Sequence, residues 1–192
     1  SISALMHKDV KAADRMISSL GDLLRMSITA ADVHEVTLKH ELEFLDKYLE
    51  IQKIRFQGQL SVTTTVEPEM LSAVVPYLFL QPLVENAIKH GISKRTDPGT
   101  INIDVGAREG RLHLRVTNDG SPPDSMEPNG KSGFGLSNMQ ARLQSLYGAH
   151  QHLQVQHLPD HSTQVEIAIP LRLSLQEQNG HESSAHKLSE QT

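Results

Sequence analysis

The sequence contains no cysteine and no tryptophan, and only 4% of its 192 residues are aromatic. The absence of cysteine excludes disulfides, thiolate catalysis and cysteine-based zinc sites, and it is compatible with a reducing cytoplasm. No apolar run reaches the roughly 18 to 20 residues that span a bilayer, and no signal peptide is visible. We therefore expect these residues to form a soluble, cytoplasmic structure that makes no contact with a membrane.

A surplus of positive charge is also missing, because the formal net charge is -5 at pH 7. Without a basic surface for a phosphate backbone, nucleic acid is not an expected partner. The hydrophobic fraction of 38% and the charged fraction of 21% suit one globular domain with an extended helical element. The chain opens at Ser1 within an apolar periodic pattern, which suggests a fragment of a longer protein.

Helical periodicity runs through residues 1–56. Apolar residues recur every three or four positions from Ile2 to Leu24, which predicts a first helix. A polar stretch separates it from a second helix, for which Thr37 is the expected N-cap and Glu41 sits favourably in the first turn. The second helix carries two neighbouring apolar stripes, formed by Leu38, Leu42, Leu45 and Leu49, and by Phe44, Tyr48 and Ile51.

Two such stripes exceed what one antiparallel helix can cover. We therefore interpret residues 1–56 as a dimerisation hairpin, which forms a four-helix bundle with a second copy of the chain. The alternative is that both helices pack on their own domain, since helical stripes are more often core than interface.

The pattern changes after Gly58, where alternation with a period of two replaces helical spacing. One helix is expected between residues 76 and 91, and another over residues 134–147, closed by Gly148. The expected strands cover residues 60–66, 101–105, 112–116, 153–155 and 165–169.

Strands interspersed with helices on one side of an otherwise antiparallel sheet predict the α+β class. We expect a two-layer α/β sandwich over residues 57–171. Within it, residues 121–132 are rich in Pro, Ser and Gly and predict a loop. Residues 172–192 are polar and are expected to form a disordered tail.

Three segments carry the chemistry. They are LQPLVENAIKHG at residues 80–91, VTNDG at 116–120 and GFGLSNMQARLQSLYG at 133–148. They resemble the asparagine box and the two glycine boxes of the ATPase superfamily that joins gyrase B, Hsp90, MutL and the sensor histidine kinases. Within this superfamily the chain is most similar to the LytS/YehU-type sensor histidine kinases, from about residue 1 to residue 170. The resemblance implies an ATP site with Mg²⁺.

The first box supplies groups for metal and phosphate. Asn86 offers a neutral carbonyl oxygen to Mg²⁺, and Lys89 and His90 follow within one turn, where the resemblance implies contacts to the phosphates. Glu85 points about 100° away from Asn86 on a helix, so its role stays open between a polarising carboxylate and a salt-bridge partner. Pro82 stands where gyrase and Hsp90 carry the water-activating Glu, which disfavours hydrolysis.

The second segment departs from the superfamily pattern Asp-x-Gly-x-Gly. When Gly120 is aligned with the first glycine, Asn118 occupies the place of the adenine-reading Asp, and Pro122 replaces the second glycine. The Asn118 carbonyl can still accept a hydrogen bond from the adenine amino group, without the assistance of a charge. Asp119 can serve only if the end of the strand is bulged by one residue.

The third segment places Gly133 and Gly135 before a helix, where backbone can approach a triphosphate closely. The resemblance implies cofactor contacts by these glycines, Phe134 and Leu136, a mobile ATP lid over the preceding loop, and support of the adenine acceptor by the Thr163 hydroxyl.

The resemblance as a whole implies the cytoplasmic catalytic and dimerisation part of a homodimeric sensor kinase with a membrane anchor. Such a kinase transfers the ATP γ-phosphoryl group to a histidine and then to a response regulator. The histidine box is expected upstream of Ser1, and His7 is interpreted as a solvated helix residue. Two alternatives stay open. Pro82 counts against a gyrase- or MutL-like ATPase, and the departures around Asn118 leave room for a nucleotide-binding scaffold without kinase activity.

Overall fold

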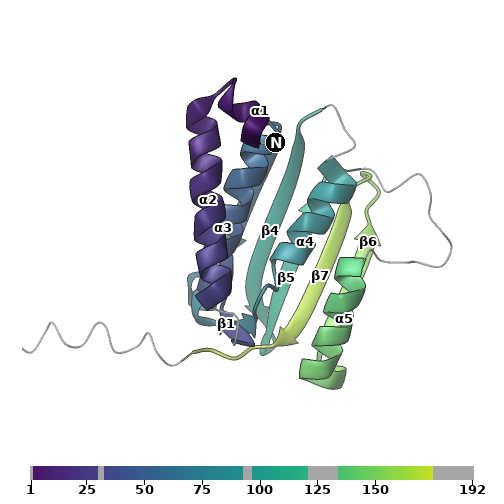
Figure 1. Ribbon diagram of the computed structural model, residues 1–192. Coiled ribbons are helices and arrows are strands. Elements are labelled where there is room, and N and C mark those ends of the chain that lie inside the picture. The colour runs from purple at the N-terminus through teal and green to yellow at the C-terminus, as the bar shows by residue number, and fades with distance from the viewer. Residues whose placement is uncertain (1, 30–32, 93–96, 121–133, 175–192) are drawn as a thin grey trace, which may run out of the picture.

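The computed structural model describes residues 2–29, 33–92, 97–120 and 134–174 (Figure 1). The N-terminal part is a helical hairpin of α1 (Ile2–Met6), α2 (Val10–Thr29) and α3 (Leu38–Arg55). One unbroken helix from Ile2 to Leu24 is wrong, because the chain turns after Met6 and the carboxylate of Asp9 caps α2 by accepting the Ala12 N–H at 2.9 Å. His7 therefore lies exposed in a turn, not in a helix.

The start of the second helix is as predicted. The Thr37 hydroxyl accepts the N–H of His40 at 3.3 Å, and α3 begins at the next residue. Thr37 is also the last residue of β1 (Glu35–Thr37), which pairs antiparallel with β3 (Val74–Pro76). The short helix η1 (Pro68–Ser72) precedes β3 in the chain.

The remaining strands are β2 (Leu60–Val66), β4 (Gly99–Arg108), β5 (Arg111–Asn118), β6 (His152–His157) and β7 (Thr163–Pro170), and the further helices are α4 (Gln81–Ala87), η2 (Ile88–Ile92), α5 (Phe134–Tyr147) and η3 (Gly148–His150). These five strands form one sheet in the order β2-β4-β5-β7-β6. The edge strand β2 runs parallel to β4, and every other neighbouring pair is antiparallel. The α+β class is confirmed, because one face of this sheet is covered by α3, α4, α5 and the π-helical turn η2 (Figure 1).

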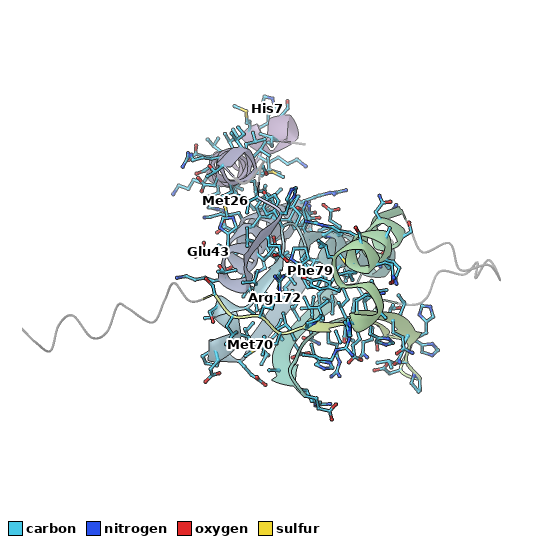
Figure 2. All side chains as sticks on the ribbon, turned by 90° about the horizontal axis from the view of Figure 1, so that it is seen from below. His7, Met26, Glu43, Met70, Phe79 and Arg172 are labelled. Carbon is cyan, nitrogen blue, oxygen red and sulfur yellow. The ribbon has the colours of Figure 1, made fainter. Side chains whose placement is uncertain are left out.

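The two long helices of the hairpin differ in how much of their apolar surface is buried. The predicted stripes of α3 are largely used within the chain, since Leu38, Leu45 and Leu49 are at most 3% exposed and belong to the core under the sheet. Packing on the chain's own domain therefore holds for α3. The uncovered apolar surface lies on α2 instead, which stands on the outer side of α3 (Figure 2). It consists of Val10, Ile17, Leu20, Leu24 and Ile28, and Met6 of α1 is exposed as well.

The C-terminal segment stays attached longer than expected. Residues 172–174 run beside η1 and β3, where Val74 N–H donates to Arg172 O and Ser174 N–H donates to Ser72 O. Arg172 also pairs with Glu35. The expected tail thus does not begin at residue 172, and residues 175–192 lie outside the described part of the chain. Among the described helices, none combines the length and the apolar character that a bilayer crossing requires.

Candidate functional site

The first predicted box forms α4 and its continuation. Pro82 lies in the first turn, as expected, where its missing N–H costs no hydrogen bond. Leu83, Val84 and Ala87 turn inward and are buried. Asn86 is half-buried and Glu85 is exposed, so the two side chains occupy different faces of the helix.

Glu85 lines a cavity between α4 and α5. This cavity of about 310 Å³ is lined on its polar side by Glu85, Asn138 and Arg142, and Gly135 of α5 borders it. Asn86 does not line this cavity. The Glu85 carboxylate accepts the side-chain N–H of Gln81 at 2.7 Å, a hydrogen bond across one helical turn. Burial, and then the charge of Glu85, raise the pKa of Tyr48 to about 12, so the phenol of α3 stays protonated at neutral pH.

Beyond Ala87 the helix widens into the π-turn η2, which carries Lys89 and His90. Such turns occur often at functional sites. Here the turn lays Gly91 directly on the end of β5. A Cβ on Gly91 would lie 2.2 Å from Asn118 Nδ2, and a Cβ on Gly120 would lie 2.0 Å from the Gly91 Cα. Backbone atoms therefore exclude a side chain at Gly120, and a side chain at Gly91 would displace that of Asn118. The first and second boxes touch at this point.

The end of β5 separates Asn118 from Asp119. The ladders to β4 and β7 are regular up to Asn118, whose side chain is 6% exposed and lies on the helix-covered face of the sheet with Val116. Asp119 is exposed. Its carboxylate accepts the N–H of Thr100 at 3.0 Å, and its own N–H donates to the Thr100 carbonyl at 3.2 Å.

Thr163 lies directly beside Asn118, because the two are register partners in β5 and β7. Its hydroxyl is 3.1 Å from Nδ1 of His157, which is in turn its register partner in β6. The structure thus brings Asn118, Thr163 and His157 into one row across the sheet. Sequence reasoning chose the first two and missed His157, which only the pairing of the last two strands could have indicated.

The third box begins α5. Gly135 lies in its first turn, and Leu136 is buried in the core. A Cβ on Gly135 would meet no heavy atom of the described residues within 4 Å, so packing inside the chain gives no reason for glycine there. Gly133 and the loop at 121–132 lie outside the described residues, and α5 starts at Phe134.

A larger hollow of about 490 Å³ lies on the opposite face of the sheet. Its lining includes Glu67, Asp104, Arg115 and Glu166. Of these residues, Asp104, Arg115 and Glu166 stand at strand positions that alternate with the buried core residues, so the three predicted boxes lie on the other side of the sheet.

Two family models match the chain. The model described as Histidine kinase matches residues 1–60, and the model described as Histidine kinase-, DNA gyrase B-, and HSP90-like ATPase matches residues 74–173. The sensor histidine kinase BtsS of Escherichia coli K12 is 31% identical over 172 residues, covering 90% of this chain and 30% of that protein. The sensor histidine kinase YesM of Bacillus subtilis is 33% identical over 165 residues, covering 84% and 28%. The chain thus spans less than a third of the length of these relatives.

Solved structures agree with the fold. The histidine kinase domain of a blue-light activated kinase from Erythrobacter litoralis has a TM-score of 0.53 at 21% identity, covering 88% of this chain and 80% of that one. The catalytic domain of the histidine kinase ThkA has a TM-score of 0.54 at 19% identity, covering 71% and 93%. Both carry the α+β arrangement predicted from the sequence.

Proposed function

The chain belongs to the histidine kinase-, DNA gyrase B- and HSP90-like ATPase family, and from this premise we propose that it is the ATP-binding and dimerisation part of a sensor histidine kinase. The resemblance to LytS-type kinases is confirmed by relatives of that name, such as LytS of Oceanobacillus iheyensis at 30% identity over 183 residues. In the proposed activity, the γ-phosphoryl group of ATP passes to a histidine and then to an aspartate of a response regulator.

The contact between the first two boxes carries this proposal. Gly91 and Gly120 meet backbone to backbone, which brings the end of the Asn86 helix next to Asn118 and Thr163. We assign the adenine amino group to the Asn118 carbonyl, with the Thr163 hydroxyl beside it. Asn118 fits this role better than Asp119, because Asp119 is exposed and already holds Thr100.

The phosphates and the metal are assigned to the two helices above the sheet. The Asn86 carbonyl oxygen suits Mg²⁺, a hard cation that keeps several waters and is held mainly through the triphosphate. Lys89 and His90 on the π-turn would donate to phosphate oxygens, together with backbone N–H groups near Gly135. The space around Gly135 that the described chain leaves open favours this backbone approach.

Phosphoryl transfer to histidine suits these residues better than hydrolysis. A neutral imidazole is already a nucleophile near pH 7 and needs no base beside the nucleotide. At the position of the water-activating Glu this chain has Pro82, which cannot accept a proton. The gyrase-like alternative is therefore disfavoured.

We divide the chain by role into a dimerisation hairpin over residues 1–56, an ATP-binding layer over 57–171 and a tail. The proposed dimer contact moves from α3 to α2, whose outward apolar stripe is uncovered in the described chain. A homodimer would cover this stripe with its own copy and form the four-helix bundle.

Binding of Mg-ADP should raise the melting temperature. At 100 times its dissociation constant the nucleotide should stabilise the fold by about 2.7 kcal/mol, because it binds only the native state. Asn86→Ala should remove most of the difference between measurements with and without Mg²⁺. Asn102→Ala, an exposed position on β4, is the matched control and should change nothing. Equal shifts with and without Mg²⁺ in the wild type would refute the metal assignment.

Phosphoryl transfer to histidine distinguishes a kinase from a nucleotide-binding scaffold without kinase activity. A full-length protein containing this chain should take up label from γ-labelled ATP on histidine, in an acid-labile form, and Asn86→Ala should lose that label. Nucleotide binding without any label on histidine would favour the scaffold.

A further inference from the structure

A buried carboxylate from the hairpin holds the segment that leads into α4. Glu41 of α3 is 1% exposed. Its two oxygens accept three consecutive backbone N–H groups, those of Leu78 at 2.6 Å, Phe79 at 2.7 Å and Leu80 at 3.0 Å. Burial raises the pKa of the Glu41 carboxyl above its ordinary value, and these three hydrogen bonds lower it in part. A buried carboxylate is costly without such donors, so Glu41 and this segment depend on each other.

α4 has no cap of its own. Leu80 stands at the N-cap and contributes no side-chain hydrogen bond, and the first turn contains Pro82. Helices leave their first N–H groups without internal acceptors, and a Ser, Thr, Asp or Asn at the N-cap usually satisfies one of them. Here the acceptor comes from Glu41, 39 residues earlier in the chain.

The backbone is bent to reach this carboxylate. Leu78 has φ +54°, in the left-handed region that non-glycine residues rarely adopt. This conformation lets the N–H groups of three successive residues converge on one side chain. Phe79 consequently lies in the interior of the domain (Figure 2). Glu43, which is on α3 like Glu41, is exposed at the edge of the molecule (Figure 2).

The opposite side of the same segment is held from α5. The guanidinium of Arg142 donates to the carbonyl of Tyr77 at 2.5 Å and to the carbonyl of His34 at 3.2 Å. An anion from α3 thus holds the N–H groups of residues 78–80, and a cation from α5 holds the carbonyl just before them.

We propose that Glu41 is a positioning residue for the nucleotide site, which ties the start of the Asn86 helix to helix α3 of the hairpin. This inference rests on the proposed function for the identity of the ligand. Hydrogen bonds weaken steeply once the heavy atoms separate by about 0.5 to 1 Å beyond these distances. A shift of α3 by that amount would therefore release or drag the start of α4, and Asn86 with it.

The test compares Glu41→Gln with Glu43→Gln, an exposed glutamate on the same helix. The amide keeps the shape of Glu41 but loses its charge, and its NH₂ group faces backbone donors. We expect the dissociation constant for Mg-ADP to rise about tenfold, as for the loss of one hydrogen bond to a charged group, while sedimentation stays unchanged. Glu43→Gln should leave the affinity as it is.

A double-mutant cycle of Glu41 with Asn86 distinguishes a positioning role of Glu41 from a general loss of stability. If Glu41 acts through Asn86, Glu41→Gln should cost little further affinity in an Asn86→Ala background, whereas independent effects would add. Amide exchange of residues 83–87 provides a readout without ligand and should accelerate in Glu41→Gln. If Glu41→Gln does not fold, Glu41→Asp, which keeps the charge but is one methylene shorter, should change both readouts in the same direction by less.

The outcomes separate the two proposals. A wild-type protein that binds no nucleotide would refute the proposed function, and exchange in α4 would still test the role of Glu41. Unchanged affinity together with unchanged exchange in a folded Glu41 variant would overturn the inference, as would additive losses with Asn86→Ala.

Discussion

Replacing Asn118 with leucine should reduce the affinity for Mg-ADP by about 100-fold, whereas Asn118→Asp should keep or tighten it. Leucine has nearly the shape of asparagine but no acceptor, so the adenine amino group would be buried without a partner, which costs about 1–3 kcal/mol. Aspartate would add the assistance of a charge, which roughly doubles the strength of a hydrogen bond. Isothermal titration calorimetry of the three proteins provides the measurement.

The neighbouring Asp119→Asn is the matched control. It retains an oxygen for the Thr100 N–H and lies outside the row formed by the buried Asn118 and its strand partner Thr163, so adenine selectivity over guanine nucleotides should not change. Lost selectivity in Asp119→Asn, with normal binding by Asn118→Leu, would move the adenine assignment by one residue.

Charges on the outer face of α2 should convert a homodimer into monomers. Ile17 and Leu24 are seven residues apart, 50% and 57% exposed, and lie on the side of α2 away from Ser19, which bonds Glu50 of α3 at 2.6 Å. Ile17→Glu with Leu24→Glu would bury unpaired ions in a dry interface at several kcal/mol each. Since each 1.4 kcal/mol is a factor of ten, dimer affinity should fall at least about 100-fold.

Sedimentation at tens of micromolar measures this change. Lys11→Glu, at an exposed position of α2 outside the stripe, controls for added negative charge and should leave the dimer intact. A wild-type protein that sediments as a monomer at this concentration would contradict the proposed interface. Substitutions at Leu49 are unsuitable for this test, because Leu49 is 3% exposed in the chain's own core and a charge there would destabilise the domain itself.

Local patterns predicted most of the fold. The alternation in β4 and β5, the Thr37 cap and the extent of α5 depend on neighbouring residues, and the structure has them as expected. The break after Met6 was not predicted, because apolar spacing continues across a turn that the carboxylate of Asp9 closes.

What covers an apolar stripe could not be predicted from local spacing. The stripes of α3 and α2 look alike in sequence, yet only the folded chain shows that α3 packs on the core and α2 does not. Glu41 illustrates the same limit. In sequence it is a favourable acidic residue of a first turn, and its actual partners, residues 78–80, come from a distant segment.

Which of the two side chains, Asn118 or Asp119, turns to the helix-covered face of the sheet also depends on residues that are distant in the sequence. Both stand before Gly120 in an ordinary turn sequence, and the family resemblance alone favoured Asn118. The regular pairing of β5 with β4 and β7 is what directs Asn118 inward beside Thr163. In the sequence Gly91 marks only the end of an expected helix, whereas in the structure its lack of a side chain allows the first two boxes to meet.

The bond from Glu41 to residues 78–80 affects where this protein can be divided or recombined. A fragment that begins after Phe56 would lack Leu38, Leu45 and Leu49 in its core. It would also leave the three N–H groups of residues 78–80 without their acceptor. By its interactions, α3 is therefore a component of the catalytic layer, although it belongs to the hairpin by sequence. Chimeras that exchange input modules between such proteins should be joined between α2 and α3, so that each catalytic layer keeps its own α3.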